Sequence, residues 1–231
     1  MTNGNPWVNG ATSTDAHDHQ KTEGEDWRRW LPSIPTPSAS GLEGPIGISS
    51  ATGPIAPQPH VSLPEDALPV RRVHSSPGLW VVGAHGGSGE STVAALDPSW
   101  QAAEHAWPEV ATGDPVACIV VARTNVRGLM AARTALTQWA ASGAGRSVKL
   151  LGLVLVADAP GRLPAPLRDL AKVVGGGSPR VWDVAWSEPW RLGEPVTERI
   201  PRTVSKTVSQ LRSLAAAVVA SADPSEIKEQ S

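Results

Sequence analysis

Residues 79–96 constrain the fold of this chain more than any other stretch. They read LWVVGAHGGSGESTVAAL: an apolar segment, a glycine-rich turn, two hydroxyl residues and the start of an apolar-periodic helix. A segment that is apolar on both faces is typical of a central strand in a parallel sheet, and glycines let the backbone turn sharply from that strand into a helix. The stretch therefore predicts a strand–turn–helix unit, with the strand at residues 79–83 and a short helix from about Ser91 that Asp97 and Pro98 end.

Apolar segments and amphipathic segments continue to alternate through the rest of the chain. We expect strands at residues 115–121, 148–157 and 180–186, and helices at residues 126–141, 163–174 and 204–220. Residues 97–115 fit a helical turn and a short strand equally. The alternation predicts a small three-layer α/β domain in which helices cover both faces of a parallel sheet.

The N-terminal third has a different composition. Residues 1–77 show no sustained helical or strand period, and Pro, Ser and Gly recur through them. Such a composition predicts a disordered tail, so we place the α/β domain at residues 78–222 and a frayed C-terminal tail at residues 223–231. Within the first tail, residues 26–31 (DWRRWL) are either a helical anchor for a protein partner or two incidental tryptophans, and the second interpretation is simpler.

Charge and composition argue against several classes of protein. The net charge of −2 and the pI of about 6.3 lack the basic footprint that direct nucleic-acid binding requires. No apolar run reaches the roughly eighteen residues of a membrane span, and the N-terminus lacks a signal pattern, so we expect a cytoplasmic protein without a membrane partner. The single cysteine, Cys118, cannot form an intramolecular disulfide, and no Cys/His cluster has zinc spacing.

The glycine turn has the frame of a phosphate-binding loop. In such a loop, backbone N–H groups surround the phosphates, a lysine reaches the β- and γ-phosphates, and the next hydroxyl holds Mg²⁺. The candidate binding residues here are His85, Gly86, Gly87, Ser88, Gly89, Glu90, Ser91 and Thr92, with Ser91 as the candidate metal ligand.

Glu90 stands where a phosphate loop has its lysine. An anion about 4 Å from a phosphate oxygen turns an attraction of roughly 4 kcal/mol into a repulsion of similar size. For nucleotide to bind, Glu90 must either face the solvent or be offset by a cation from elsewhere, such as His85, Arg123 or Arg127. An ordinary sharp turn that packs closely is the alternative explanation of the glycines.

The sequence HGGSGEST resembles the deviant phosphate loop of the ParA/MinD-type ATPases, which reads K-G-G-x-G-K-[ST]-[ST]. The resemblance puts His85 at the signature lysine, Glu90 at the loop lysine and Ser91 at the Mg²⁺ hydroxyl. It implies a fold of the P-loop NTPase-like (SIMIBI/ParA-like) type, with ATP and Mg²⁺ as ligands. The chain is also similar to small proteins of high-GC bacteria that keep this glycine loop without its lysine.

A second departure concerns the carboxylate that positions Mg²⁺ and the attacking water in active members of that family. The strand at 115–121 is followed by Ala-Arg-Thr, without a carboxylate. Asp158 does end an apolar run, in LVLVADAPG, but its late place in the chain resembles the position that contacts the nucleotide base. Asp158 is equally a turn former ahead of Pro160 and Gly161.

Two main hypotheses follow. The leading one is a degenerate ParA/MinD-like protein that does not hydrolyse nucleotide and acts as a regulatory or interaction protein, through its surface and its N-terminal tail. The alternative is an active ATPase that binds ATP and Mg²⁺ through the loop backbone, Ser91 and an arginine, and closes as a homodimer. A third hypothesis makes Glu90 a general base at an anion site. No nucleophile elbow or Ser/His/Asp set is evident, so we name no catalytic residue.

Overall fold

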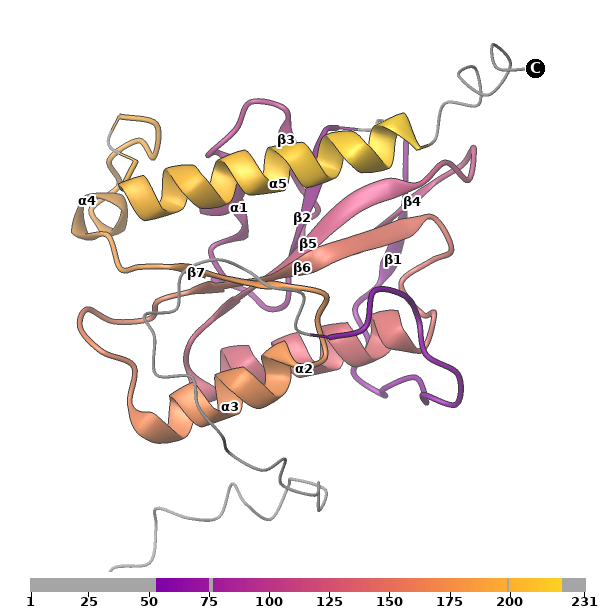
Figure 1. The fold of residues 1–231 in the computed structure, drawn as a ribbon, viewed down its shortest axis with the longest axis horizontal. Helices are drawn as coiled ribbons and strands as arrows, with labels where there is room; N and C mark the ends of the chain where they lie inside the picture. The colour runs from indigo at the N-terminus through magenta and orange to yellow at the C-terminus, as the bar shows by residue number, and fades with distance from the viewer. Residues whose placement is uncertain (1–52, 75–76, 199, 222–231) are drawn as a thin grey trace, which may run out of the picture. The chain divides into compact units, whose positions relative to one another are not determined.

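A computed structural model describes residues 53–74, 77–198 and 200–221 of the chain (Figure 1). All of them belong to one unit of the chain, Ile46–Ser231. The motif at residues 26–31, most of the expected N-terminal tail and the C-terminal tail at 223–231 lie outside the described residues. None of the helices in the described part has the length and apolar content that a membrane span requires.

The strand before the glycine turn lies inside a five-stranded parallel sheet. The strands are β3 (Trp100–Ala102), β2 (Leu79–Gly83), β5 (Val116–Arg123), β6 (Val148–Val156) and β7 (Val181–Val184), in that spatial order. Each neighbouring pair is parallel. The two longest strands, β5 and β6, are buried along almost their whole length, as expected for apolar strands covered on both faces.

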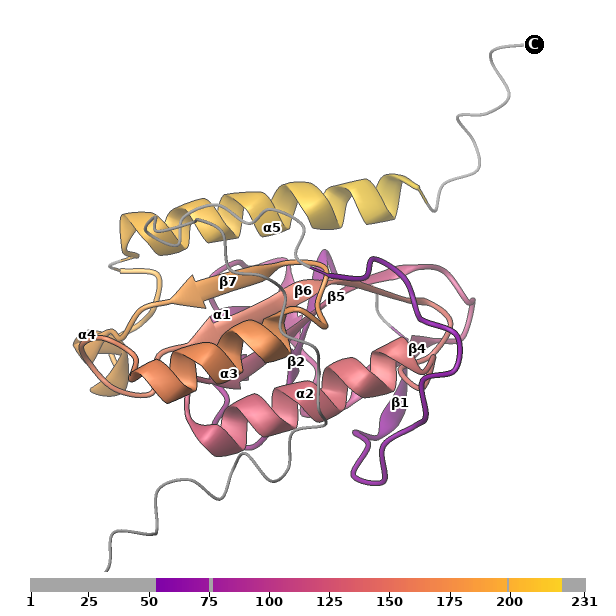
Figure 2. The same ribbon diagram turned by 60° about the horizontal axis from the view of Figure 1, so that its bottom comes forward.

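Helices cover both faces of this sheet. The helices α2 (Val126–Ala140) and α3 (Ala165–Gly175) lie on one face, and α1 (Glu90–Ala94) and α5 (Arg202–Ala220) lie on the other (Figures 1 and 2). A short helix, α4 (Glu188–Arg191), follows β7 and was not predicted. The predicted three-layer parallel α/β architecture, with its main strands and helices, is confirmed.

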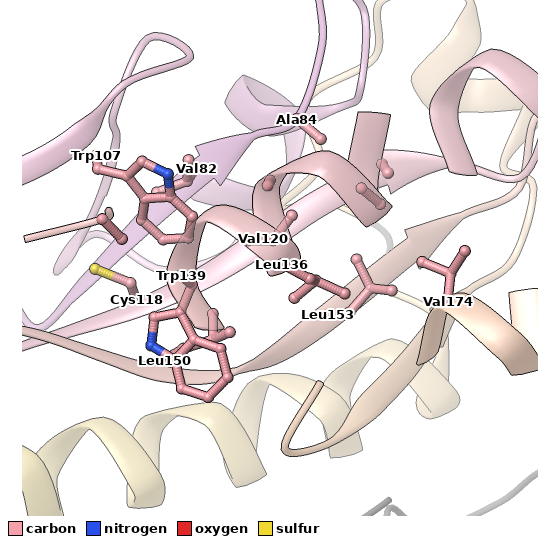
Figure 3. Packing of buried hydrophobic residues seen from close by; sticks show 14 of the residues in the cluster. Val82, Ala84, Trp107, Cys118, Val120, Leu136, Trp139, Leu150, Leu153 and Val174 are labelled. Atoms are coloured by element: carbon pink, nitrogen blue, oxygen red, sulfur yellow. The ribbon is translucent and has the colours of Figure 1, made fainter. Parts of the chain in front are cut away.

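The sheet separates two apolar cores because successive strand residues point to opposite faces. In β2, Trp80 and Val82 pack with α2 and α3, whereas Leu79 and Val81 pack with α1 and α5. Figure 3 shows the first of these cores, in which Trp139 of α2 lies beside Leu150 of β6. Burial on this scale, about 25 cal/mol per Å² of apolar surface, supplies the main driving force for the fold.

The prediction of a tail as far as residue 77 is wrong for residues 53–74. Within them, β1 (Val70–Val73) pairs in parallel with β4 (Trp107–Val110) to form a second, two-stranded sheet. The segment ahead of β1 is held by α2: the backbone N–H of Gln58 donates to the carbonyl of Ala140, and the side chain of Gln138 both accepts from the N–H of Leu68 and donates to its carbonyl. This segment lacks periodicity because its backbone is held by another element.

The ambiguous region 97–115 contains two short strands, β3 and β4. Between them, Glu104 and His105 both have a positive φ, of 55° and 57°. This conformation is uncommon for residues other than glycine, and the residue types in AAEHAW do not predict it. The turn that it makes brings His105 back to the end of β2.

Candidate functional site

The glycine loop runs from the end of β2 to the start of α1. Gly87 has a φ of 77° and Gly89 a φ of 96°, so both occupy the left-handed region that favours glycine. A Cβ on Gly86 or Gly87 would meet nothing within 4 Å, so neither glycine is needed for close packing. The loop therefore has the conformational demands of a tight strand-to-helix turn, with an exposed outer surface at residues 86 and 87.

The side chain of Glu90 points into the protein. It is only 8% exposed, and its Oε2 lies 3.0 Å from Nδ1 of His105, while its Oε1 accepts the backbone N–H of His105 at 3.2 Å. Of the two arrangements considered for Glu90, the one in which it faces solvent does not occur. The residue that faces Glu90 is His105, which is none of the three residues that the sequence suggested.

Three polar groups converge beside Gly83, at the end of β2. A Cβ on Gly83 would lie 2.6 Å from Nδ1 of His105, 2.7 Å from the hydroxyl oxygen of Ser88 and 2.8 Å from Oε2 of Glu90. Nδ1 of His105 also lies 3.1 Å from the carbonyl oxygen of Gly83, so this ring nitrogen carries the proton. The glycine is required here because any side chain would displace these groups.

The same cluster is not arranged for nucleophilic catalysis. A serine nucleophile needs its hydroxyl at one ring nitrogen of the histidine and the orienting carboxylate at the other. Here the carboxylate of Glu90 lies at Nδ1 of His105, and no hydrogen bond joins the hydroxyl of Ser88 to either ring nitrogen. The hydroxyl of Ser88 is fully buried, and among the described residues it has no hydrogen-bond partner. The convergence fixes the loop and leaves no activated nucleophile.

The side chain of His85 is held by its neighbours. The backbone N–H of Arg123 donates to its Nε2 at 3.3 Å, and its Nδ1 donates to the carbonyl of Gly86 at 2.9 Å. A Cβ on Gly128, in the first turn of α2, would lie 2.9 Å from that Nε2. The ring therefore occupies a slot between the loop, β5 and α2, in a neutral tautomer.

Arg123 ties the loop to the end of β6. Its Nε donates to the carbonyl of Gly87 at 3.2 Å, and its Nη1 donates to the carbonyl of Ala157 at 2.7 Å. The same guanidinium lines a pocket of about 190 Å³, together with Thr92 and Arg191 and the side chains of Trp186 and Trp190. Two of the residues that line this pocket, Arg123 and Arg191, are arginines.

Ser91 and Thr92 lie at the start of α1, a helix of only five residues. Ser91 is exposed, and Thr92 is half-buried at the wall of the arginine pocket. The described residues contain no group of three or more His, Cys, Asp or Glu side chains that would hold a metal ion. The role of Ser91 as a Mg²⁺ ligand stays a prediction.

Asp158 lies outside the pocket beside the loop, and its role as a nucleotide contact stays a prediction. It is exposed, its backbone N–H donates to the hydroxyl of Thr124 at 3.1 Å, and it lines a separate pocket of about 420 Å³ with Leu167 of α3. Thr92 lines the pocket beside the loop, and Asp158 does not. The structure thus brings His85, Ser88 and Glu90 together around the loop and leaves Asp158 at another site.

The residue that the sequence analysis missed is His105. A glutamate at the first position of a helix that follows a buried strand needs a partner, and His105 is the one basic side chain in residues 97–115. The lone basic residue in this region was therefore the signal that could have identified the partner of Glu90. The signal was weak because nothing in the sequence shows that the two positive-φ residues turn the chain back toward the loop.

The comparisons with known proteins add a family and no function. The model of DUF6668, a family of unknown function, matches residues 77–208 of the chain, which is more than half of its length. Neither a curated protein nor a solved structure matches the chain.

Proposed function

The chain belongs to DUF6668, a family of unknown function, and we propose that its domain is a degenerate relative of the ParA/MinD-type ATPases that does not hydrolyse nucleotide and acts as a regulatory or interaction protein. The observation that carries the proposal is the buried pair of Glu90 and His105. A carboxylate stands at the position of the loop lysine, and the imidazole that faces it is paired with that carboxylate.

Phosphoryl transfer depends on positive charge and on a positioned water, and both are poorly provided for at this loop. A triphosphate in the loop would face Glu90, and His85 is bound in a neutral tautomer to backbone groups. The helix that follows has five residues, so few aligned peptide dipoles support an anion at its start. These features favour a loop that serves as a structural turn in a binding domain.

Isothermal titration of the full chain with ATP, ADP and GTP in the presence of Mg²⁺ tests the proposal. We expect no saturable heat and no release of phosphate. The double variant Glu90→Lys, His105→Gln restores a cation without a competing histidine, and we expect it to gain affinity that the wild type lacks. Micromolar binding together with turnover in the wild type would overturn the proposal.

The regulatory role makes a separate prediction in cells. A chromosomal Ser91→Ala variant lacks the hydroxyl that a Mg²⁺-dependent enzyme needs. Cells with this variant should have the phenotype of the wild type, whereas cells in which the whole reading frame is deleted should differ from the wild type. If Ser91→Ala reproduces the effect of the deletion, the protein acts through a metal–nucleotide complex and not through its surface alone.

A second candidate function is the binding of ATP without the loop lysine. The pocket of Arg123 and Arg191 favours it, because two guanidinium groups beside the hydroxyl of Thr92 suit a phosphate group. This hypothesis predicts that Arg191→Ala abolishes ATP binding, whereas Arg133→Ala, on an exposed position of α2, leaves it unchanged. Equal affinities of the two variants would exclude the arginine pocket as the ATP site.

A further inference from the structure

A second pocket lies away from the glycine loop, at the carboxyl ends of β5, β6 and β7. It has a volume of about 420 Å³, within the range of sites that hold small organic molecules. Its wall includes residues that follow β5, the segment from the end of β6 into α3, the end of β7 and the start of α5. Carboxyl ends of parallel strands are where open α/β sheets bind their ligands.

One side of the pocket is apolar. Leu155 of β6 is 3% exposed, and Leu163 and Leu167 are half-buried beside α3. All three belong to or pack against the core between the sheet and α2 and α3. They offer a rigid hydrocarbon surface to whatever enters.

The other side carries Asp183, and its carboxylate is uncompensated. In β7, Trp182 and Val184 contribute to the core under α5, so Asp183 points to the opposite face, toward α3. Among the described residues, no hydrogen bond or ion pair holds its carboxylate. Burial by the surrounding protein raises the pKa of Asp183 above its usual value, although the side chain remains open to solvent. Both observations suit a group on the wall of an open pocket.

Two other charged side chains line the pocket. Asp158 and Arg162 both belong to the loop between β6 and α3, and both are exposed, as Asp183 is. The lining therefore holds two carboxylates and one guanidinium. With these three groups ionised its net charge is negative, which favours a cationic ligand.

We propose that this pocket binds a small organic amine, whose ammonium group pairs with the carboxylate of Asp183 and whose hydrocarbon body lies against Leu155, Leu163 and Leu167. A cation supplies the partner that Asp183 lacks in the protein itself. An organic acid of the same shape is repelled by the same carboxylate. The site is separate from the glycine loop, so its existence does not depend on the function proposed above.

The test uses three probes with one hydrocarbon body and different end groups: phenethylamine, 2-phenylethanol and 3-phenylpropionate. Each is titrated into the full-length, ¹⁵N-labelled protein and followed by the amide shifts. We expect phenethylamine to shift amides in residues 157–167 and 183–185, with a dissociation constant on the order of 1 mM, as suits a ligand of this size. We expect 3-phenylpropionate to bind at least about tenfold more weakly.

Two variants test which carboxylate pairs with the ammonium group, and a third tests where the hydrocarbon part of the ligand lies. Asp183→Asn keeps the shape of the side chain and should weaken phenethylamine about tenfold, while Asp169→Asn, on an exposed position of α3 outside the pocket, should have no effect. Leu167→Trp fills the pocket and should abolish the shifts. Thermal unfolding of each variant shows that it is folded.

Several results would overturn the proposal. These are equal binding of the amine and the acid, an Asp183→Asn protein that binds phenethylamine as well as the wild type, shifts that map elsewhere, or no saturable shift by the amine. Titration of the same samples with nucleotide tests the glycine loop separately, so a failure of the amine site can be told apart from a failure of the function proposed for the loop.

Discussion

Nδ1 of His105 lies 3.0 Å from Oε2 of Glu90, and the pair joins the first residue of α1 to the turn between β3 and β4. The carboxylate is 8% exposed and the imidazole 43%, so the buried member depends on the more exposed one. A buried carboxylate without a partner is costly. The pair therefore fixes both the charge of the loop and the path of residues 103–106.

His105→Ala should destabilise the protein by roughly 1–3 kcal/mol, because it leaves Glu90 buried without its partner. Glu90→Gln should cost less, since the amide oxygen can still accept the backbone N–H at residue 105. Urea unfolding of the two single variants and the double variant measures the coupling between the residues. A coupling of zero would mean that the pair has no energetic role.

Gly128→Ala should destabilise the protein by more than about 2 kcal/mol, because the new Cβ would lie 2.3 Å from the carbonyl oxygen of Arg123 and 2.9 Å from Nε2 of His85. Gly86→Ala is the matched control. A Cβ there meets nothing within 4 Å, and we expect a change within about 0.5 kcal/mol. Thermal unfolding of both variants checks the difference. Similar losses would show that His85 is not held in a tight slot.

Asp97 gives the stability a specific pH dependence. It is 3% exposed, and this burial opposes its ionisation. Two hydrogen bonds from Ser99 and the pairing with Arg212 of α5 outweigh the effect of burial. Together they hold the pKa of Asp97 below its usual value. A lowered pKa in the folded state stabilises the protein above the unfolded pKa of about 3.9, and this contribution is lost as the pH falls through the folded value.

Asp97→Asn should therefore be less stable than the wild type by roughly 1–2 kcal/mol above about pH 5, a modest value because Arg212 is largely exposed. The difference in free energy of unfolding between the two proteins should become smaller below about pH 4. Urea unfolding at a series of pH values measures this difference. Asp114→Asn is the control, because Asp114 is exposed and far along the chain from α5. A gap that does not vary with pH would contradict the ion pairing.

Gln138 connects the N-terminal segment to α2 through a fully used side-chain amide. Its Oε1 accepts from Leu68 and from Nε1 of Trp107, and its Nε2 donates to the carbonyls of Leu68 and Gly143. Gln138→Leu should cost about 2–4 kcal/mol, because it leaves buried polar groups unpaired. It should also speed proteolysis within residues 53–69. Gln210→Leu, which removes one half-buried bond to Trp182, should cost less than half as much and leave the proteolysis rate unchanged.

The sequence predicted the central architecture because apolar runs such as VACIVVA and the helix periods carry that information locally. The course of residues 53–74 was not predictable, because Leu68 is held by Gln138, seventy positions away, and not by a pattern of its own. The strands β3 and β4 are three and four residues long, too short for a period to show. Hydrogen bonds between distant segments decided these parts of the fold.

The sequence shows which residues make up the glycine loop but not the contact at its centre. The glycines and the glutamate at position 90 are visible in the sequence. The orientation of Glu90 depends on a turn at His105 with positive φ, and a sequence does not report φ. The pocket of Asp183 was also not foreseen, because its wall is assembled from the ends of several elements.

The convergence of three side chains on Gly83 has an evolutionary consequence. A change of Glu90 to a cation would place it against His105, a change of His105 alone would strand a buried carboxylate, and any side chain at position 83 would collide with both. Each of these single substitutions gives a less stable protein, so the effect of a change at one of the three positions depends on the residues at the other two. A lysine at position 90 would therefore not be tolerated as a single substitution, and several coordinated changes would be needed to introduce a cation into this loop.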